Sequence, residues 1–418
     1  MSDEKTQRAK SKLQLSNSKL NRLLEITNAI NNNSSRKSLF AVLQDVLINE
    51  LHIGKFVLFT FEAYWRVALT EGISEAEAKK VDLKYIVENY KSIDVLSSNK
   101  QESLEQFDVV IPVFQEDKPL AYMLLADFEG EKIEISPIIK HLRFIQTLAN
   151  IIVVALENKR LNTEYIKQIA IKKELELAQN MQSLLFPRKL PNSTDLMVEA
   201  YYLPHSEVGG DYYDVINLKD GNIALCMADV SGKGMPAALL MANFQANLRA
   251  LLNVTQDVSE LVRQCNKKVI ESADYEKFIT LFVAIFNPKN KTLTYLNAGH
   301  QPAILSQNGS LQLLKKGCTV LGMFDELPKI ESETIPLNFN SKLICFTDGL
   351  TELEDKSGNQ LEIEGLIALV ENKNSIHEIT DSFKKTIKEL EDNSGLNDDI
   401  TFLAAEFLSE ASSSNSDQ

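Results

Sequence analysis

Residues 222–252, NIALCMADVSGKGMPAALLMANFQANLRALL, decide how the C-terminal half of the chain folds. An apolar, strand-like run leads to Asp229, a turn follows in which Gly232 and Gly234 flank Lys233, and an apolar helix begins after it. A carboxylate at the end of a buried strand is costly to bury without a partner. The adjacent glycines permit backbone shapes, and a close approach of a ligand, that other residues forbid. The stretch therefore predicts a strand, a turn and a helix with a functional carboxylate beside the turn.

Three further segments of the C-terminal half place aspartates in a similar setting. They are GGDYYD at 209–214, FTDG at 346–349 and NDDIT at 397–401. Each is ambiguous alone, because an Asp-Gly pair is most often a turn and neighbouring aspartates also occur in helix caps and loops. The segments hold too few Lys or Arg residues to neutralise these acids, and carboxylate oxygens are the ligands that hard divalent cations prefer. The ordered set of four predicts a shared metal site.

The sequence around these segments, residues 191–408, alternates short strand-like runs with helical patterns, as expected of an α/β sandwich. The strand-like runs are NIALCMADV, FITLFVAIFN, TLTYLNAGH, PAILSQ and KLICFTDG. Residues 409–418, SEASSSNSDQ, contain no apolar residue after Ala411 and are expected to form a disordered tail.

The N-terminal half has a different pattern. Residues 1–35 are polar with a helical stripe of apolar positions, which predicts an N-terminal helical arm or a short coiled coil. Ser34 or Ser35 is placed to cap the next helix. Residues 36–155 contain a helix, the strand KFVLFTFE, a hairpin of DVVIPVF and LAYMLLADF, and a long helix from about Pro137.

This order of elements in residues 36–155 resembles a GAF domain, a sensory fold in which helices flank a central antiparallel sheet. Another small sensor fold such as PAS fits the same order, and a dimerisation module without a ligand is a further alternative. Residues 156–190 continue the helical pattern until Pro187 and predict a helical linker or switch. A rigid helix can pass a rotation or a shift from one domain to the next. A passive spacer with one buried face is the alternative.

The overall composition narrows the classes of function. The chain has 418 residues, 44% of them hydrophobic and 24% charged, which is typical of a soluble protein with more than one domain. A net charge of −14 argues against a broad nucleic-acid-binding surface. The sequence predicts neither a signal peptide nor a membrane span. The four scattered cysteines indicate neither a disulfide framework nor a zinc site, so we expect a cytoplasmic protein.

Taken in order, the motifs resemble the PPM/PP2C family of serine/threonine phosphatases. They are similar to its bacterial branch, typified by the stage-II sporulation phosphatase and the stress-response phosphatases that act on anti-sigma-factor antagonists. The resemblance runs over about 210 residues and rests on ELELAQNMQSLLFPRKLP, VGGDYYDVI, MADVSGKGMPAALLMA, TYLNAGHQPAIL, FTDGLTE and NDDIT. It implies an antiparallel β-sandwich flanked by helices, with two divalent cations, Mn²⁺ or Mg²⁺, at one end.

The resemblance also implies the roles of single residues. Asp229 is expected to bridge both ions, with Asp211 and the backbone carbonyl of Val230 completing one site and Asp348 and Asp398 the other. Asp229 and Asp211 are thus the expected catalytic residues. Two cations would neutralise the phosphate and lower the pKa of a bridging water, whose hydroxide would attack phosphorus without a covalent phosphoenzyme.

Other residues in these motifs have less certain roles. Asp399 lies next to an expected ligand, and the turn with Gly232 and Gly234 is a candidate for ordering the metal site or for acting as a switch. Eukaryotic relatives carry a histidine at the position of Ser231, so the general acid is unassigned here. His300 is a candidate for that acid, although a structural role or a solvent acid fits the pattern better.

The predicted function is therefore a metal-dependent phosphoprotein phosphatase controlled by its N-terminal domain. We expect its substrate to be a small phosphorylated regulatory protein and the chain to form a homodimer. The sensor domain would receive a small-molecule or protein signal. A non-catalytic scaffold is the alternative, but all expected ligand aspartates are present. A nucleotide cyclase also uses paired aspartates, but lacks the AGH and NDDIT motifs.

Overall fold

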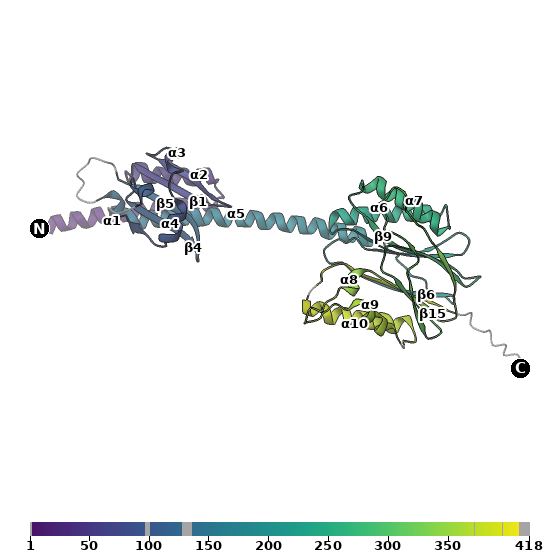
Figure 1. Cartoon of the computed structure of the whole chain (residues 1–418). Coiled ribbons are helices and arrows are strands. Elements are labelled where there is room, and N and C mark those ends of the chain that lie inside the picture. The colour runs from purple at the N-terminus through teal and green to yellow at the C-terminus, as the bar shows by residue number, and fades with distance from the viewer. Residues whose placement is uncertain (1, 97–100, 128–135, 372, 395, 409–418) are drawn as a thin grey trace. The chain divides into compact units, whose positions relative to one another are not determined.

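The computed structural model describes residues 2–96, 101–127, 136–371, 373–394 and 396–408 (Figure 1). These residues form two compact units, Met1–Ile169 and Ala170–Gln418, which are treated separately below. The expected disordered tail at 409–418 lies outside the described residues.

The N-terminal unit contains one antiparallel sheet with the strand order β2-β1-β5-β4-β3. Its strands are β1 (Lys55–Phe61), β2 (Trp65–Glu71), β3 (Asp94–Val95), β4 (Val109–Gln115) and β5 (Lys118–Ala126). The predicted hairpin is confirmed, because β4 pairs with β5 across the turn at 116–117. The helical elements are α1 (Ser2–Asn31), α2 (Arg36–Asp45), a π-helical turn (Val46–Glu50), α3 (Glu75–Ala78), α4 (Leu83–Asn89) and a 3₁₀ turn (Glu102–Leu104).

Both faces of this sheet are buried. Along β1, Phe56 and Leu58 face a core shared with α1, α2 and the following long helix, whereas Val57 and Phe59 face a second core below α3 and α4. Side chains alternate between the two faces of a strand, so a strand covered on both sides carries an unbroken apolar run. This explains why KFVLFTFE has no polar alternation. An antiparallel sheet covered by helices agrees with the predicted GAF-like arrangement, but the GAF assignment stays a prediction.

The predicted helix start after residues 31–36 is confirmed. The Ser35 hydroxyl accepts a hydrogen bond from the Ser38 backbone N–H at 3.1 Å and caps α2. The apolar positions of α1 differ in burial along the helix. Leu13 and Leu20 are exposed, whereas Ile26, nearer its C-terminal end, is fully buried in the core.

The long helix α5 (Pro137–Ser183) runs without interruption for 47 residues, from the N-terminal unit into the C-terminal one. Its first part buries Ile145, Leu148 and Ile152 against the sheet. By length and composition alone, one window of α5 could cross a membrane, but 44% of that window is buried inside the protein. The core helix of a soluble protein has the same properties, so this is weak evidence for a membrane span.

The C-terminal unit is built on two sheets. The first has the order β13-β10-β9-β8-β7 with β14 beside β10, and the second has the order β12-β11-β15-β16-β6. Among the described residues of this unit, the paired strands are antiparallel except β13 with β10. The bounds are β6 (Leu196–Leu203), β7 (Tyr212–Asn217), β8 (Ile223–Val230), β9 (Ile279–Asn287), β10 (Thr292–Ala298), β11 (Ala303–Gln307), β12 (Ser310–Leu314), β13 (Gly317–Cys318), β14 (Glu333–Pro336), β15 (Ser341–Phe346) and β16 (Ile400–Phe407).

Helices cover the outer face of each sheet (Figure 1). They are α6 (Met235–Leu252) and α7 (Val258–Ala273) on the first sheet, and α8 (Asp348–Thr351), α9 (Glu362–Val370) and α10 (Ile376–Ser394) on the second. Along β8, Leu225 and Met227 lie between the two sheets, whereas Cys226 and Ala228 face the helices. The predicted antiparallel β-sandwich flanked by helices is confirmed.

Candidate metal centre

Asp211, immediately before β7, is held by residues from two distant motifs. Its Oδ2 accepts a hydrogen bond from the Thr347 hydroxyl at 2.8 Å and another from the Thr401 hydroxyl. The Thr347 and Thr401 backbones also bond to each other, with Thr347 N–H donating to the Thr401 carbonyl at 3.0 Å. Asp211 is 1% exposed. The GGDYYD, FTDG and NDDIT segments therefore meet at one buried carboxylate.

Asp229 is the second-to-last residue of β8, just before the glycine turn, and it lies among the other acids. Burial is the main reason why its pKa rises to about 7, and the negative charges of Asp348, Asp398 and Asp399 add to the rise. A hydrogen bond with Asp211 acts in the opposite direction. The pKa of Asp211 is also raised, first by burial and then by the charge of Asp229. The two carboxyls thus form a close pair that resists full ionisation.

Asp348 and Asp398 lie on the more open side of this group. Asp348 is the first residue of α8, and burial followed by the charge of Asp398 raises its pKa. Asp398 forms an ion pair with Lys233, whose ammonium lies 2.9 Å from its Oδ2. The same ammonium donates to the Asn397 carbonyl. The turn after Asp229 and the NDDIT loop are thereby brought together.

Asp399 has a different role from Asp398, although the two are adjacent. Its Oδ1 accepts from the His205 backbone N–H at 2.8 Å and its Oδ2 from the Gly210 N–H at 2.7 Å. A Cβ at Gly209 would lie 2.2 Å from Asp399 Oδ2, so only glycine fits beside this carboxylate. Asp399 therefore positions the loop that leads to Asp211.

The carbonyl of Val230 faces the same loop. A Cβ added to Gly210 would approach the Val230 carbonyl oxygen to 2.9 Å. The backbone on both sides of the candidate centre is thus packed too closely for any larger residue at 209 or 210. This close packing accounts for the paired glycines before Asp211.

The donor set fits hard divalent cations. The four predicted aspartates and the Val230 carbonyl offer oxygen atoms, which are the ligands that Mg²⁺ and Mn²⁺ prefer. Burial raises the pKa of both Asp211 and Asp229, and the charges of neighbouring acids add to the rise, so a cation would relieve the repulsion within the group. Among the described residues, no three His, Cys, Asp or Glu side chains are already placed as they would be around a bound metal ion.

The glycine turn has the backbone shape that its sequence requires. Gly232 and Gly234 have φ values of +90° and +73°, in the region that favours glycine. Gly234 caps α6 at the predicted start of that helix. Ser231, at the position where eukaryotic relatives have histidine, accepts a hydrogen bond on its hydroxyl from the Phe278 N–H at 2.9 Å. This contact ties the turn to the chain just before β9.

His300 is buried and is hydrogen-bonded through both its ring and its backbone. Its Nδ1 lies 2.7 Å from the Thr280 hydroxyl, and its backbone N–H donates to the Asn297 side chain at 2.8 Å. Burial lowers its pKa to about 4. A neutral, buried imidazole is poorly suited to donate a proton at neutral pH, which favours the structural role over that of a general acid.

Two contacts of the site were not anticipated from the sequence. The side chain of Gln182, in the last turn of α5, donates to the Gly209 carbonyl at 2.7 Å and accepts from the Gly209 N–H at 3.2 Å. The hydroxyls of Thr347 and Thr401 hold Asp211, although their motifs were noted only for their aspartates. Asp214, in the same segment as Asp211, is bonded instead to Arg249 at 2.6 and 3.0 Å. It is therefore outside the candidate centre.

Known proteins share these motifs and this fold. The family model for stage II sporulation protein E (SpoIIE) matches residues 219–408. Phosphoserine phosphatase RsbU of Bacillus subtilis (strain 168) is 31% identical over 241 residues, which cover 56% of this chain and 70% of RsbU. The chain belongs to the SpoIIE-type PP2C phosphatases.

As a member of this family, the chain is a serine/threonine protein phosphatase of the PPM type. Phosphoserine phosphatase RsbP of the same bacterium is 25% identical over 186 residues, covering 43% of this chain and 46% of RsbP. Among solved structures, the SiaA-PP2C domain of Pseudomonas aeruginosa has a TM-score of 0.51 at 18% identity. The match covers 58% of this chain and 98% of that domain, and shows that the two share a fold.

Proposed function

We propose that this SpoIIE-type phosphatase hydrolyses phosphoserine or phosphothreonine on a small regulatory protein, such as an anti-sigma-factor antagonist. Phosphatases of this family are metal-dependent in general. The observation that carries the proposal is the buried pair Asp211 and Asp229, with Asp348 and Asp398 beside it. We assign Asp211, Asp229 and the Val230 carbonyl to one cation, and Asp229, Asp348 and Asp398 to a second.

The chemistry follows from this assignment. When bound, two Mn²⁺ or Mg²⁺ ions would neutralise the phosphate and activate a water for direct attack on phosphorus. The residues of the chain supply the geometry: Thr347 and Thr401 orient Asp211, and Asp399 fixes the loop before it. The Lys233 ammonium lies at the edge of the group, 51% exposed, where it can contact an anionic substrate. No protein side chain of the described site is assigned as the general acid, so solvent serves that role.

We also propose that the N-terminal unit regulates this site in a cytoplasmic homodimer. The support for regulation is α5, which packs in the N-terminal core through Ile145 and Leu148 and bonds Gly209 through Gln182. A change in α5 that moves Gln182 would act on the loop that carries Asp211. The turn with Gly232 and Gly234 is the second candidate for a switch, since it joins Asp229 to α6.

The first experiment measures phosphate release from p-nitrophenyl phosphate with Mn²⁺. In Asp229→Asn we expect activity to fall by about a hundredfold or more, because metal ions contribute several kcal/mol to catalysis of this kind. Asp220→Asn is the matched control, since Asp220 is an exposed loop residue that bonds Asn222. Full activity in Asp229→Asn would contradict the assignment. If the full-length wild type were silent, the same pair of variants would be compared on a phosphorylated partner protein.

A further inference from the structure

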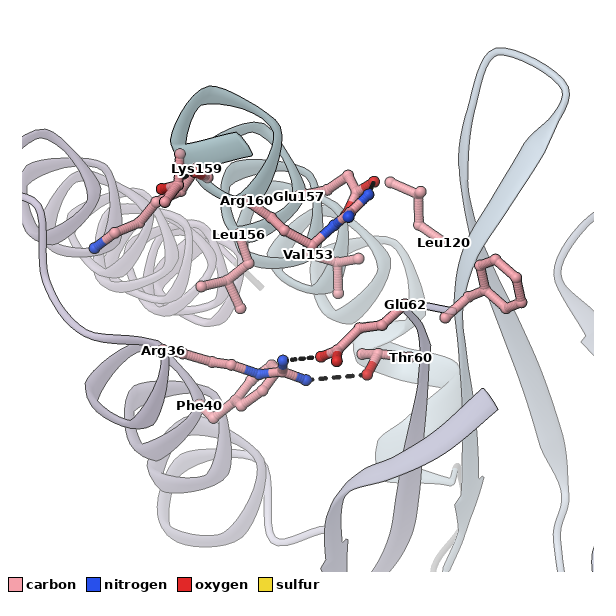
Figure 2. Close-up of a pocket in the computed structure, with 12 residues that line it drawn as sticks. Arg36, Phe40, Thr60, Glu62, Leu120, Val153, Leu156, Glu157, Lys159 and Arg160 are labelled. Carbon is pink, nitrogen blue, oxygen red and sulfur yellow. Dashed lines mark hydrogen bonds and ion pairs between the residues drawn. The ribbon is translucent and has the colours of Figure 1, made fainter. Parts of the chain in front are cut away.

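The N-terminal unit contains a cavity that the phosphatase reaction does not use. It has a volume of about 290 Å³ and lies between the start of α2, the end of β1, the start of β5 and residues 153–163 of α5 (Figure 2). At roughly 30 Å³ for each water molecule, this space would hold about ten waters or a ligand of about ten non-hydrogen atoms. The space is partly open to solvent, and a hollow of this size beside a buried core is a candidate ligand site.

The floor of the cavity is apolar. Phe40, Leu120 and Val153 are buried residues that line it, and Leu156 faces them from α5 (Figure 2). Ligand sites in proteins are typically lined by such side chains, with a few polar groups that fix the orientation. The floor therefore favours a ligand with an apolar body.

The rim carries paired charges on both sides. Arg36 is bonded to Glu62 and donates to the Thr60 hydroxyl at 3.2 Å (Figure 2). On α5, Arg160 holds both oxygens of Glu157 at 2.9 and 2.8 Å. Every one of these four charged groups thus has an opposite charge beside it.

Lys159 shifts the balance of the lining toward positive charge. Its ammonium donates to the Asn33 and Ser34 carbonyls at 3.2 Å each, and in the described part of the chain it has no carboxylate partner. The lining therefore holds three cationic and two anionic side chains. Just outside the lining, Glu164 pairs with Arg160 at 2.6 Å and Arg66 lies 3.6 Å from Glu62, so the group as a whole keeps one excess positive charge. An occupant with one negative charge would balance it.

Thr60 gives a second indication of what binds. It is 7% exposed, and its hydroxyl oxygen already accepts from Arg36. Within the described residues, the Thr60 hydroxyl donates its own hydrogen to no acceptor. A buried hydroxyl normally satisfies its hydrogen-bonding capacity. An acceptor oxygen in the cavity, beside the Arg36 guanidinium, would complete both groups.

We propose that this cavity binds a small organic acid, a single carboxylate on an apolar body of about ten non-hydrogen atoms. The carboxylate receives hydrogen bonds from Arg36 and Thr60, in the charge-assisted geometry that guanidinium groups form with carboxylates. The apolar body lies against Phe40, Leu120 and Val153. This proposal concerns the N-terminal unit and stands independently of the proposed phosphatase mechanism.

The test is isothermal titration of the full chain with phenylacetate and octanoate, each of which has ten non-hydrogen atoms. Phenylacetamide and octanamide are the neutral controls of the same shape. We expect saturable binding of at least one acid with one site per chain, and binding of its amide weaker by about tenfold or more, as the loss of a charge-assisted hydrogen bond implies. Equal binding of acid and amide would overturn the assignment of a carboxylate, and no saturable binding of either acid would overturn the site.

Variants locate the binding. Leu156→Trp should fill the cavity and abolish binding, and Arg36→Gln should weaken it by about tenfold. Glu62 keeps an ion-pair partner in Arg36→Gln, because Arg66 lies 3.6 Å from its other oxygen. Arg66→Gln, at an arginine outside the cavity lining, is the matched control and should bind as the wild type does. Circular dichroism and thermal unfolding establish that each variant is folded. Unchanged affinity in folded Leu156→Trp would place the ligand elsewhere and overturn the proposal.

Discussion

At the scale of single residues, the site depends on how carboxylates are supported as much as on which carboxylates are present. Asp211 is buried with Asp229 close by, and the hydroxyls of Thr347 and Thr401 donate to its Oδ2. These donors stabilise the ionised form of Asp211, since hydrogen bonds to a carboxylate lower its pKa. Asp399 is adjacent to Asp398 but uses both oxygens to hold backbone N–H groups.

The threonine contacts predict the effect of removing one hydroxyl. Thr401→Val should lower kcat/KM on the order of tenfold, because a hydrogen bond to a charged group contributes about 1.5–3 kcal/mol. The change also raises the pKa of Asp211 further, so the loss should be larger at pH 6 than at pH 8. Steady-state kinetics at both pH values measure this. Thr401→Ser keeps the hydroxyl and should stay near wild type; if it lost as much as Thr401→Val, packing rather than the hydrogen bond would be responsible.

The raised pKa of Asp229 predicts how the metal-free protein responds to pH. An unfolded aspartate titrates near 3.8, whereas burial and neighbouring acids move the folded value to about 7. Between these values the folded state binds more protons than the unfolded state, so its stability falls as the pH rises from about 4 to about 7. Above about pH 7, Asp229 is ionised in both the folded and the unfolded state, and its charge destabilises the metal-free fold to the full extent.

Neutralising this residue should therefore stabilise the metal-free protein at high pH only. With EDTA present, Asp229→Asn should have a higher free energy of unfolding than the wild type at pH 8, and the advantage should shrink toward pH 5. Urea unfolding at the two pH values measures the difference. A wild type that is more stable than Asp229→Asn at pH 8 without metal would contradict the picture of mutually repelling acids.

At the scale of elements, the end of α5 and the loop before β7 act as one structure. The Gln182 side chain makes two hydrogen bonds to the Gly209 backbone and is 7% exposed. Losing them leaves buried backbone groups without partners, which costs about 1–3 kcal/mol for each unsatisfied group. Pro187 prevents the helix from continuing, so α5 ends at Ser183 and Gln182 lies in its last turn.

This contact predicts that Gln182→Ala lowers the apparent affinity for Mn²⁺ and lowers kcat, because the loop that carries Asp211 is no longer held. A titration of phosphatase activity with Mn²⁺, together with direct Mn²⁺ binding followed by electron paramagnetic resonance, separates the two effects. Asn180→Ala is the matched control, since Asn180 is exposed on the same turn. Wild-type metal binding and activity in Gln182→Ala would show that the loop keeps its shape without α5.

At the scale of the whole molecule, the chain consists of two units with separate cores, and α5 contributes residues to both. The division at Ile169 and Ala170 falls inside the segment 156–190 that was predicted as the linker. Exposed apolar residues follow the middle of this helix, among them Leu161, Tyr165 and Ile169. Such a stripe agrees with the proposed homodimer.

Removal of the N-terminal unit tests the proposed regulation. A chain of residues 156–418 should differ from the full chain in oligomeric state, in specific activity, or in both. Light scattering and phosphate release on the same preparations measure these properties. If the shortened chain has the same oligomeric state and the same activity, the N-terminal unit does not control the site.

Much of the fold could be predicted from local sequence. The run NIALCMADV becomes β8, the turn with Gly232 and Gly234 precedes α6, and Ser35 caps α2. These outcomes depend on burial, backbone freedom and capping, which act between residues close in the chain. The continuation of α5 beyond residue 155 could also be predicted, because the helical pattern continues until Pro187.

The sequence by itself determined the element types and the family, because strand and helix periods and the order of acidic motifs are local properties of the chain. Only the tertiary structure decided which side chain serves which carboxylate. Thr347 and Thr401 reach Asp211 across 136 and 190 residues, and Asp399 reaches Gly210 across 189. The same structure separated Asp398, beside Lys233, from Asp399, which holds a loop. Such pairings follow from strand register and sheet packing, which no spacing along the chain encodes.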